Sequence, residues 1–293
     1  MDMDLDSLRC FEAAATTLRF RAAAARVHLS AAAFSDRIRR LEESLGVPLL
    51  RRTTRRVTLT DAGRRLLPLA REVLAGVERM QVAAGDSPRP LPYELVVGTR
   101  YEVGLSWLCP ALVPLSRKRP ERTIHLYTGS SGDLLWRLER GDLDAVVASM
   151  RLTSPRVSYA AVHHERYSLV GATRCLRRRD DARKLILVDK TPDLPLFRYF
   201  LDALRNAEPW PFADVEYMGG IGNMRRRVLD CEDRVAVLPD FFVAKDLAAK
   251  RLVKLLPDIE LLTDALRLVY RTGHPREAQL IALAADLREH PLR

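Results

Sequence analysis

The sequence has few cysteines and no long apolar run, and both absences narrow the class of protein. The four cysteines are far apart and form neither a CxxC pair nor a cluster with histidine, so we expect reduced thiols and no metal site. No apolar segment reaches the roughly 18–20 residues of a membrane span. The acidic start, Met1–Asp6, lacks the apolar core of an export signal. We therefore expect a cytoplasmic protein that does not bind membranes.

Catalytic signatures are missing as well. The sequence contains none of the motifs GxGxxG, GxxxxGK(S/T), HExxH and GxSxG, which mark nucleotide-binding and hydrolase sites. Neither a nucleophile with a base and an orienting group nor a pair of carboxylates stands out. We expect that the chain is not an enzyme and carries no cofactor.

The sequence does contain a basic block near its N-terminus. The 293 residues carry a net charge of +10, and residues 19–65 hold twelve arginines against four acidic residues. A net charge of +8 thus falls in less than a sixth of the chain, whereas the other segments nearly cancel. A local excess of this kind indicates a face that binds nucleic acid.

The basic block has the apolar spacing of a helix-turn-helix. Residues 5–18 and 20–27 predict two helices. Ser30 can cap a third helix, which ends at Gly46. The apolar residues of that third helix fall on one stripe: Phe34, Ile38, Leu41 and Leu45. Two short helices with one buried stripe and one polar face are typical of this DNA-binding motif.

A small hairpin and a long helix follow. Residues 49–52 and 56–59 can pair as the strands of a wing. Thr60 can cap a helix over residues 61–84, and the continuous apolar stripe of that helix predicts a partner, most economically a second copy of the chain. Packing against the helix's own chain is the alternative. A proline-rich linker at residues 85–92 ends this part.

Strand-like and helical runs alternate beyond the linker. The strand-like runs are residues 94–97, 123–127, 145–148, 167–170, 185–188, 215–217, 235–238, 252–255 and 267–270. Helical runs cover residues 102–118, 131–140 and 275–289. This alternation predicts α/β layers around mostly parallel sheets.

The first 63 residues resemble the LysR-type transcriptional regulators. Members carry a Leu-x-x-Phe pair, an alanine-rich helix, a serine cap, an Ile-x-x-Leu-Glu-x-x-Leu-Gly segment and a Leu-Thr-x-Ala-Gly segment. This chain matches them in register at Leu8, Phe11, Phe20, Ala22–Ala25, Leu29, Ser30, Ala33, Ser35, Ile38, Leu41, Glu42, Leu45, Gly46, Leu49, Arg52, Leu59, Thr60, Ala62 and Gly63. It departs at Ala31 and Ala32, where the family usually has glutamine followed by proline or serine. Beyond residue 90 the resemblance rests on the order of the elements.

The resemblance implies an α/β multidomain fold. It suggests a winged helix-turn-helix at residues 1–60, then a dimerising linker helix and hinge at 61–90. A C-terminal part similar to a periplasmic binding protein follows, with two α/β subdomains, the second inserted into the first. Subdomain I would comprise residues 91–160 plus 268–293, and subdomain II residues 161–267. The runs 157–170 and 265–271 would cross between them.

The polar side of the third helix and the wing supply the expected DNA contacts. Ser35, Asp36 and Arg37 are candidates for base edges, whereas Arg39 and Arg40 are candidates for phosphate contacts. Ion pairs on a solvated helix face are the alternative for these charges. The full predicted set is Ser30, Ala31, Ala32, Ser35, Asp36, Arg37, Arg39, Arg40, Arg51, Arg52, Arg55 and Arg56.

Polar residues after several predicted strands are candidates for an effector site. Ligands in such folds lie between subdomains, at strand ends and helix N-termini. Hydroxyl and N–H groups there suit a carboxylate or another small anion, and Arg100 would add positive charge. The predicted set is Thr99, Arg100, Tyr101, Thr128, Ser130, Ser131, Gly222 and Asn223. Ordinary capping of loops is the alternative.

We therefore expect a sequence-specific regulator that binds double-stranded DNA as a homodimer or homotetramer. A small-molecule co-inducer would control it from the cleft between the subdomains, and RNA polymerase is a further candidate partner. One alternative is a constitutive DNA-binding regulator with no effector. The other is an enzyme or solute-binding protein with an N-terminal extension, which would require a catalytic set or an export signal.

Overall fold

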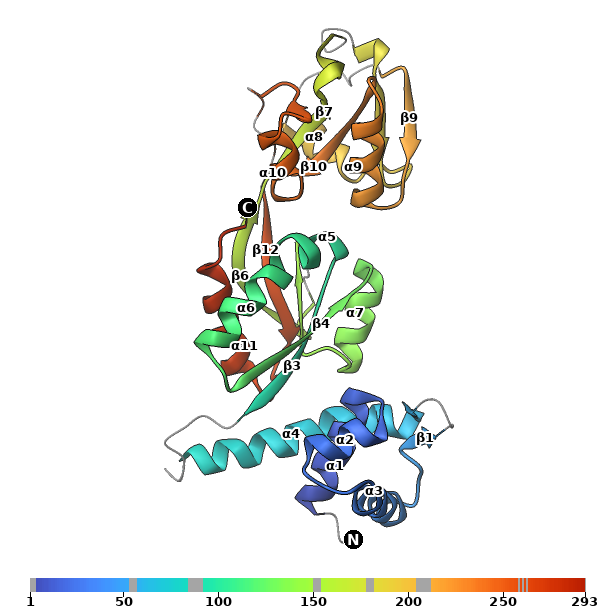
Figure 1. Cartoon of the computed structure of the whole chain (residues 1–293), viewed down its shortest axis with the longest axis vertical. Coiled ribbons are helices and arrows are strands. Elements are labelled where there is room, and N and C mark those ends of the chain that lie inside the picture. Colours follow the sequence, from blue (N-terminus) through green and yellow to red (C-terminus); the bar gives the residue numbers. More distant parts are fainter. Residues whose placement is uncertain are drawn as a thin grey trace.

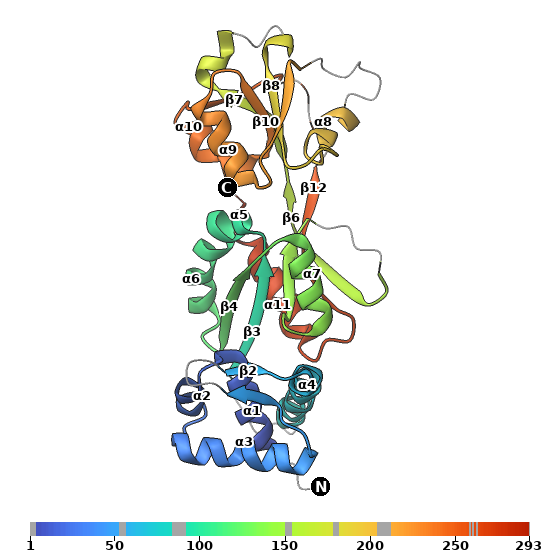
Figure 2. The same ribbon diagram turned by 90° about the vertical axis from the view of Figure 1, so that its right-hand side faces the viewer.

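The computed structural model describes residues 4–52, 57–83, 92–149, 154–177, 182–203, 212–257, 259, 261 and 263–292. These residues form three lobes along the long axis of the molecule (Figure 1). A helical N-terminal domain lies at one end, and two α/β subdomains follow it, as the side view also shows (Figure 2). Most of the expected linker, residues 85–91, lies outside the described residues.

The N-terminal domain is a winged helix-turn-helix, as the sequence predicts. Its elements are α1 (Leu5–Thr17), α2 (Phe20–Arg26), α3 (Ala31–Leu45), β1 (Leu50–Arg52), β2 (Val57–Leu59) and α4 (Asp61–Ala83). Strands β1 and β2 pair antiparallel. The predicted caps form, since the Ser30 hydroxyl accepts from the Ala33 N–H at 3.2 Å and the Thr60 hydroxyl from the Gly63 N–H at 3.0 Å. Gly46 ends α3 in the left-handed conformation that favours glycine.

The core of this domain joins the helices of the motif. Phe11, Phe34 and Ile38 are fully buried, and the ring of Phe20 meets that of Phe34 edge-on at 5.2 Å. Burial of each such side chain stabilises the fold by about 1.5–3 kcal/mol. The recognition motif is therefore a packed unit.

Helix α4 buries only part of its apolar surface. Leu67 and Leu74 face the core of the N-terminal domain. Leu69, Val73 and Met80 instead remain 57%, 45% and 71% exposed. An apolar face thus remains uncovered within one chain, which matters for assembly.

Subdomain I is built on a five-stranded sheet with the order β4-β3-β5-β12-β6 among the described residues. Its elements are β3 (Tyr93–Thr99), α5 (Tyr101–Val103), a π-helical turn (Gly104–Leu108), α6 (Cys109–Lys118), β4 (Arg122–Thr128), α7 (Ser131–Arg140), β5 (Ala145–Ala148), β6 (Val157–Glu165), β12 (Asp264–Arg271) and α11 (Glu277–Arg288). Leu115 and Leu283, from α6 and α11, pack in one cluster with Val147. Leu138 of α7 packs with Val146 in another, so successive residues of β5 face opposite layers of helices.

Subdomain II contains a second five-stranded sheet, with the order β11-β7-β10-β8-β9 in the described ranges. Its elements are β7 (Tyr167–Ala172), short 3-10 helices (Thr173–Arg177 and Ala182–Lys184), β8 (Ile186–Asp189), α8 (Phe197–Ala203), β9 (Asp214–Tyr217), α9 (Ile221–Asp230), β10 (Arg234–Pro239), α10 (Asp240–Ala248) and β11 (Leu252–Lys254). A single apolar cluster, which includes Phe200, Met224 and Val237, holds these elements together.

Two segments connect the subdomains. Strands β6 and β12 pair antiparallel along their whole length in the first sheet, and β7 enters the second sheet directly after Arg166. The predicted boundaries at residues 160/161 and 267/268 fall inside β6 and β12. The expectation of mostly parallel sheets is wrong, because β12 and β7 run antiparallel to their neighbours in the two sheets. Over the described ranges, no helix is both long and apolar enough to cross a bilayer.

Candidate nucleic-acid interface and effector cleft

Helix α3 presents one face to the core and the opposite face to solvent. Phe34, Ile38 and Leu41 are buried. Ala31 and Ala32 in the first turn are exposed, and Ser35 is half-buried beside them. Small side chains here leave the backbone of α3 open to close approach, but they offer few polar groups to base edges.

The exposed charges of α3 form a chain of ion pairs. Asp36 contacts Arg39 at 2.5 Å and Arg40 at 2.8 Å, and Arg39 also contacts Glu43 at 2.6 Å. Hydrogen bonds from Arg39 hold the pKa of Asp36 below its usual value. Arg39 and Arg40 remain 58% and 70% exposed. Since exposed pairs are worth little in water, these guanidinium groups can exchange an acidic partner for phosphate.

Arg37 lies in a different environment from the one that the sequence suggested. Its guanidinium reaches back to the start of α1, where it contacts Asp4 at 3.3 Å and Asp6 at 3.5 Å. Asp4 also accepts from the Ser7 N–H at 2.6 Å, which caps α1. Arg37 therefore ties α3 to α1, and its role as a base reader remains a prediction. The two acidic residues Asp4 and Asp6 were the feature of the sequence that could have indicated this partner for Arg37.

The wing is described only in part. Arg51 is exposed on β1, where it pairs in register with Thr58. Arg52 belongs to the same strand, whereas Arg55 and Arg56 lie outside the described residues. A DNA-binding role for these arginines therefore remains a prediction from the sequence.

The strand ends of subdomain I bring two predicted effector residues together. Thr99 and Thr128 are register partners at the ends of β3 and β4. A Cβ on Gly104 would lie 3.0 Å from the Thr128 methyl and 3.2 Å from that of Thr99, so glycine permits this close approach. The Thr99 side chain is buried, however, and its hydroxyl donates to the Val147 carbonyl at 2.8 Å. Thr99 thus shapes the site without presenting its hydroxyl.

Arg100 is buried against an acidic partner that sequence reasoning missed. Its guanidinium contacts the fully buried Glu165 at 2.8 Å, and Glu102 lies at 4.0 Å. Its Nε has no hydrogen-bond partner in the described part of the chain. Glu165 is the last residue of β6. It is the one acidic residue of the run 157–170, and this feature could have marked it as a partner for a buried cation. Arg100 is therefore already neutralised, contrary to the expectation that it adds free positive charge.

Subdomain II contributes a second cation to this region. Burial and repulsion from Arg100 lower the pKa of the Lys190 ammonium, while Glu102 and Asp189 raise it. Lys190 directly follows β8, and its backbone N–H donates to the Asp189 carboxylate at 2.6 Å. Sequence reasoning did not single out Lys190, although it stands at a strand end like the predicted residues.

The remaining predicted effector residues are local caps or exposed side chains. Tyr101 is 64% exposed, and the Ser130 hydroxyl caps α7 by accepting from the Asp133 N–H at 3.3 Å. Ser131 begins α7. Gly222 and Asn223 lie in the first turn of α9, where the Asn223 amide donates to the Met218 carbonyl at 3.3 Å. These contacts fit the capping alternative, and ligand binding by these residues remains a prediction.

The four cysteines lie on separate parts of the fold. All four are free. Cys10 is buried in α1, and burial raises the pKa of its thiol to about 11, which disfavours the reactive thiolate. Cys109 is exposed at the start of α6, Cys175 is buried after β7, and Cys231 ends α9. The described residues contain no group of three or more His, Cys, Asp or Glu side chains that could hold a metal ion.

Comparison with known proteins gives matches to both parts of the chain. Residues 5–64 match the family "Bacterial regulatory helix-turn-helix protein, lysR family", and residues 89–291 match "LysR substrate binding domain". A Mycobacterium xenopi protein described as "Probable hydrogen peroxide-inducible genes activator" is 33% identical over 165 residues, 56% of this chain and 87% of that protein. "HTH-type transcriptional activator IlvY" of Salmonella typhimurium is 32% identical over 153 residues, 52% of each protein. The chain thus aligns with only about half of the latter.

A solved structure shares the whole architecture. The structure of a variant of full-length OxyR from Pseudomonas aeruginosa matches 99% of both chains with a TM-score of 0.71 and 21% identity. At that identity the likeness shows the fold alone. The first family match covers the winged helix-turn-helix, and the second covers the paired α/β subdomains. Proteins with this organisation are DNA-binding transcription regulators with an effector-binding domain, and they are not enzymes. The chain belongs to the LysR family of bacterial transcription regulators.

Proposed function

We propose that this regulator binds operator DNA sequence-specifically as a homo-oligomer and responds to a small anion held between subdomains I and II. The single observation behind the anion is the buried Nε of Arg100, which has no hydrogen-bond partner in the described part of the chain, and Lys190 of subdomain II is the second cation that supports it. The two cations come from different subdomains, and their repulsion helps to lower the pKa of Lys190. An anion that accepts from the Arg100 Nε and attracts Lys190 would favour the arrangement that brings the subdomains together.

A ligand screen on two variants tests this proposal. The wild-type chain is titrated with a panel of small carboxylates and phosphates, and binding is followed by calorimetry. Lys190→Met should abolish the binding of any anion that the wild type takes up. Lys184→Met is the matched control, because Lys184 is an exposed lysine of the same subdomain. Equal binding by Lys190→Met and the wild type would reject the site.

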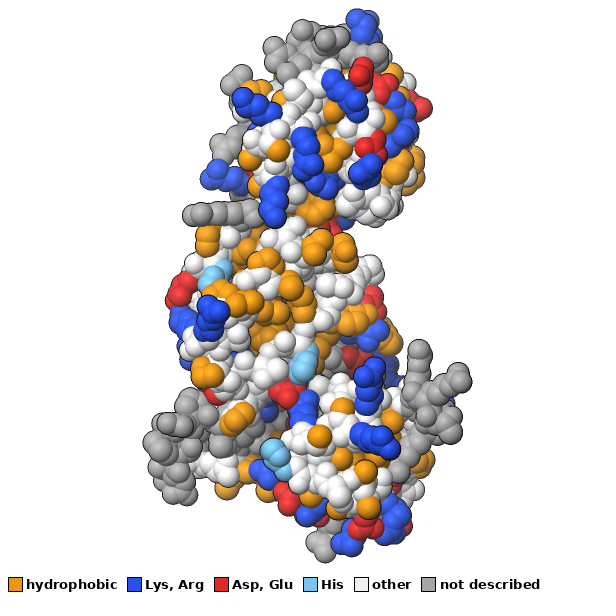
Figure 3. Space-filling view, in the orientation of Figure 1, with side chains coloured by type: hydrophobic (Ala, Val, Ile, Leu, Met, Phe, Trp, Pro, Cys, Tyr) orange, Lys and Arg blue, Asp and Glu red, His pale blue; other side chains and the backbone are white. Residues whose placement is uncertain are grey.

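The oligomer is supported by the uncovered apolar surface of α4, which includes Leu69, Val73 and Met80. Hydrophobic side chains also gather on the face that carries α5 and α6 (Figure 3), where Leu105 and Val113 are exposed. Apolar surface of this extent favours association with a second copy. Val73→Glu should weaken the oligomer in sedimentation experiments, whereas Glu72→Gln on the same helix should leave it intact.

Two recognition helices of such an oligomer would enter successive major grooves. DNA binding should then weaken steeply with salt, because phosphate contacts release counterions. RNA polymerase is a further proposed partner. Reconstituted transcription with the wild type and Val73→Glu would test whether assembly is needed for that contact.

A constitutive regulator with no effector is the main alternative, and it predicts that no ligand of the panel binds.

Peroxide is a second candidate signal, because one relative is described as a peroxide-inducible activator. An oxidant would need an accessible thiolate, and Cys109 is the exposed cysteine of the described residues. If peroxide is the signal, Cys109→Ser should remove the change in DNA affinity on oxidation. An unchanged peroxide response in that variant would point to another cysteine.

A further inference from the structure

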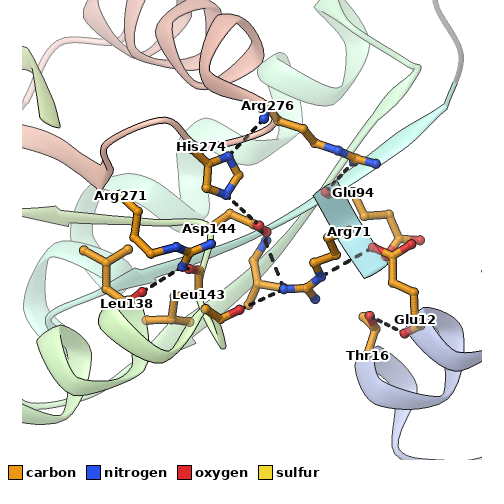
Figure 4. A network of polar contacts seen from close by, with 12 residues as sticks. Glu12, Thr16, Arg71, Glu94, Leu138, Leu143, Asp144, Arg271, His274 and Arg276 are labelled. Carbon is orange, nitrogen blue, oxygen red and sulfur yellow. Dashed lines mark hydrogen bonds and ion pairs between the residues drawn. The ribbon is translucent and has the colours of Figure 1, made fainter. Parts of the chain in front are cut away.

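The N-terminal domain docks on subdomain I of its own chain through a group of charged side chains, which lies toward the N-terminal ends of strands β3 and β5 (Figure 4). Arg71 of α4 is at the centre. It contacts Glu12 of α1 at 3.4 Å, and its Nη1 donates to the Gly141 carbonyl at 3.0 Å. The same nitrogen lies 3.9 Å from Asp144. Arg71 is only 13% exposed, so both domains together remove this cation from water.

Subdomain I is shaped to receive α4. Gly141 ends α7 with a φ of +80°, a conformation that glycine adopts without strain. A Cβ at this position would lie 3.3 Å from the Cβ of Pro68 on α4. The glycine therefore permits both the turn and the close approach of the helix.

Asp144 is the fixed end of the contact. It is buried, it accepts from the Val96 N–H at 2.7 Å, and His274 approaches it at 3.3 Å. Burial by itself would raise the pKa of Asp144, but the charge of Arg71 and the hydrogen bond from His274 hold it at about 2. The carboxylate therefore stays ionised at neutral pH and attracts Arg71.

The contact lies on the same strands as the region around Arg100. Val96 belongs to β3, which ends at Thr99, and Asp144 directly precedes β5. The two strands pair at Val97–Thr99 and Ala145–Val147. A movement at the Thr99 end of these strands would therefore also shift Asp144, because the two strands are hydrogen-bonded to each other.

The rest of the interface is loosely packed. Hollows of about 480 and 300 Å³ lie between the two domains. The first is lined by Arg64, Trp136 and Asp142 among others, and the second by Arg26 and Glu94. Arg26 and Glu94 also form an ion pair. Apolar side chains such as Leu18, Leu67 and Trp136 also line the larger hollow without filling it, and an interface packed this loosely separates more readily than a closely packed core.

We propose that Arg71 is a positioning residue, which holds the DNA-binding domain against subdomain I in one of two arrangements and releases it in the other. Its charge pairs set the orientation of α3 relative to the effector-binding domain. The consequence for regulation rests on the proposed effector response, but the docking itself requires neither effector nor DNA.

A distance measurement in the full-length protein tests the docking. Spin labels are attached at Ala25→Cys on α2 and Glu139→Cys on α7, both exposed positions, after Cys109 and Cys231 are replaced by serine. An excess of unlabelled chain restricts each oligomer to one labelled subunit. The parent should give one narrow distance, and Arg71→Ala should broaden the distribution toward longer distances. A distribution for Arg71→Ala that overlays that of the parent would overturn the proposal.

Two further variants guard against a simple loss of folding. Glu12→Gln removes the partner of Arg71 on α1 and should broaden the distance to a smaller degree. Glu72→Gln changes the next, exposed residue of α4 and should match the parent, and broadening in this control would also overturn the proposal.

The salt slope of DNA binding should be the same for Arg71→Ala and the parent, because a buried residue adds no phosphate contact. A fall in that slope by about one would mark Arg71 as a phosphate contact and reject the positioning role.

Failure of the proposed function would look different. If no anion binds, the distance change in Arg71→Ala is unaffected, since it is measured without ligand. If an anion binds and the distance distributions of the parent and Arg71→Ala agree, the positioning role of Arg71 is rejected and the proposed anion site is retained.

Discussion

Arg39 on the recognition helix and Arg100 beside the crossing strands are both paired with carboxylates, yet their surroundings differ. Arg39 is 58% exposed and shares two acidic partners within its own helix. Arg100 is 11% exposed and meets a carboxylate of zero exposure from a strand 65 residues away. The first pair is solvated and local, and the second is dry and joins distant parts of the chain.

The difference indicates what each region can do. Water weakens the pairs of Arg39, so a phosphate can replace Asp36 or Glu43 at little cost. Desolvation makes the pair of Arg100 costly to break, so a ligand must fit around it. The predicted DNA face is thus suited to exchange of partners, and the region around Arg100 to a fixed arrangement of charges.

The largest expected effect is on the buried pair. Glu165→Ala leaves Arg100 buried with only Glu102 near it, and the free energy of unfolding of the regulatory subdomains should fall by about 3–5 kcal/mol. Denaturant titration followed by circular dichroism measures this. Glu43→Ala, which removes an exposed acid of α3, should change stability by less than about 0.5 kcal/mol. Similar losses in the two variants would remove the contrast between the regions.

The double variant Arg100→Met, Glu165→Met sharpens the same point. Apolar residues of similar size need no partner, so the double variant should recover most of the stability that Glu165→Ala loses. A double variant as unstable as Glu165→Ala would mean that packing, and not an uncompensated charge, sets the loss.

The next largest effect is a pH dependence of the free energy of unfolding, which another buried acid, Asp286, should cause. Lys118, Arg119 and Arg122 donate to Asp286, and they hold its pKa at about 2 although burial raises it. Because the folded pKa lies below the unfolded value of 3.8, the contribution is complete above that pH and is lost as the pH falls toward 2. The wild type should lose about 2 kcal/mol more than Asp286→Asn between about pH 5 and pH 2. Parallel stability curves for the two proteins would contradict this assignment.

The two regions also differ in how far the sequence predicts them. The helix-turn-helix is local, because caps such as Ser30, the Gly46 stop and the stripe at Phe34, Ile38 and Leu41 all lie within a few turns. The first two helices, the wing strands and α4 follow the predicted ranges closely. Patterns that depend on neighbours in sequence are therefore reliable there.

The site between the subdomains could not be predicted in the same way. Glu165 lies 65 residues after Arg100, with β4, α7 and β5 between them in the chain, and Lys190 follows β8 of the second sheet. Helices α8, α9 and α10 were not predicted, and the antiparallel return of β12 changed the expected sheet. The strand ends were located correctly, but the partners of a charge at such an end depend on tertiary contacts.

A smaller effect on DNA binding separates two arginines of α3. Arg39→Ala should lower affinity about tenfold and reduce the salt slope by about one, because the exposed guanidinium of Arg39 can exchange Asp36 or Glu43 for a phosphate. Arg37→Ala, which loses contacts to Asp4 and Asp6, should leave the salt slope unchanged. Binding to operator and to scrambled DNA at several salt concentrations gives both quantities. An equal fall in the slope for both variants would place Arg37 among the phosphate contacts, beside Arg39.

The smallest effect concerns the start of the recognition helix, where Ser30 has two proposed tasks. Its hydroxyl caps α3 through the Ala33 N–H, so Ser30→Ala should cost about 1 kcal/mol of stability. Ser30→Asp keeps the cap and places a negative charge at the DNA face. Its stability should therefore match the wild type while its DNA affinity falls below that of Ser30→Ala. If Ser30→Asp binds DNA as well as the wild type does, the N-terminus of α3 does not approach the phosphates, and the proposed DNA-binding face must be moved along the helix.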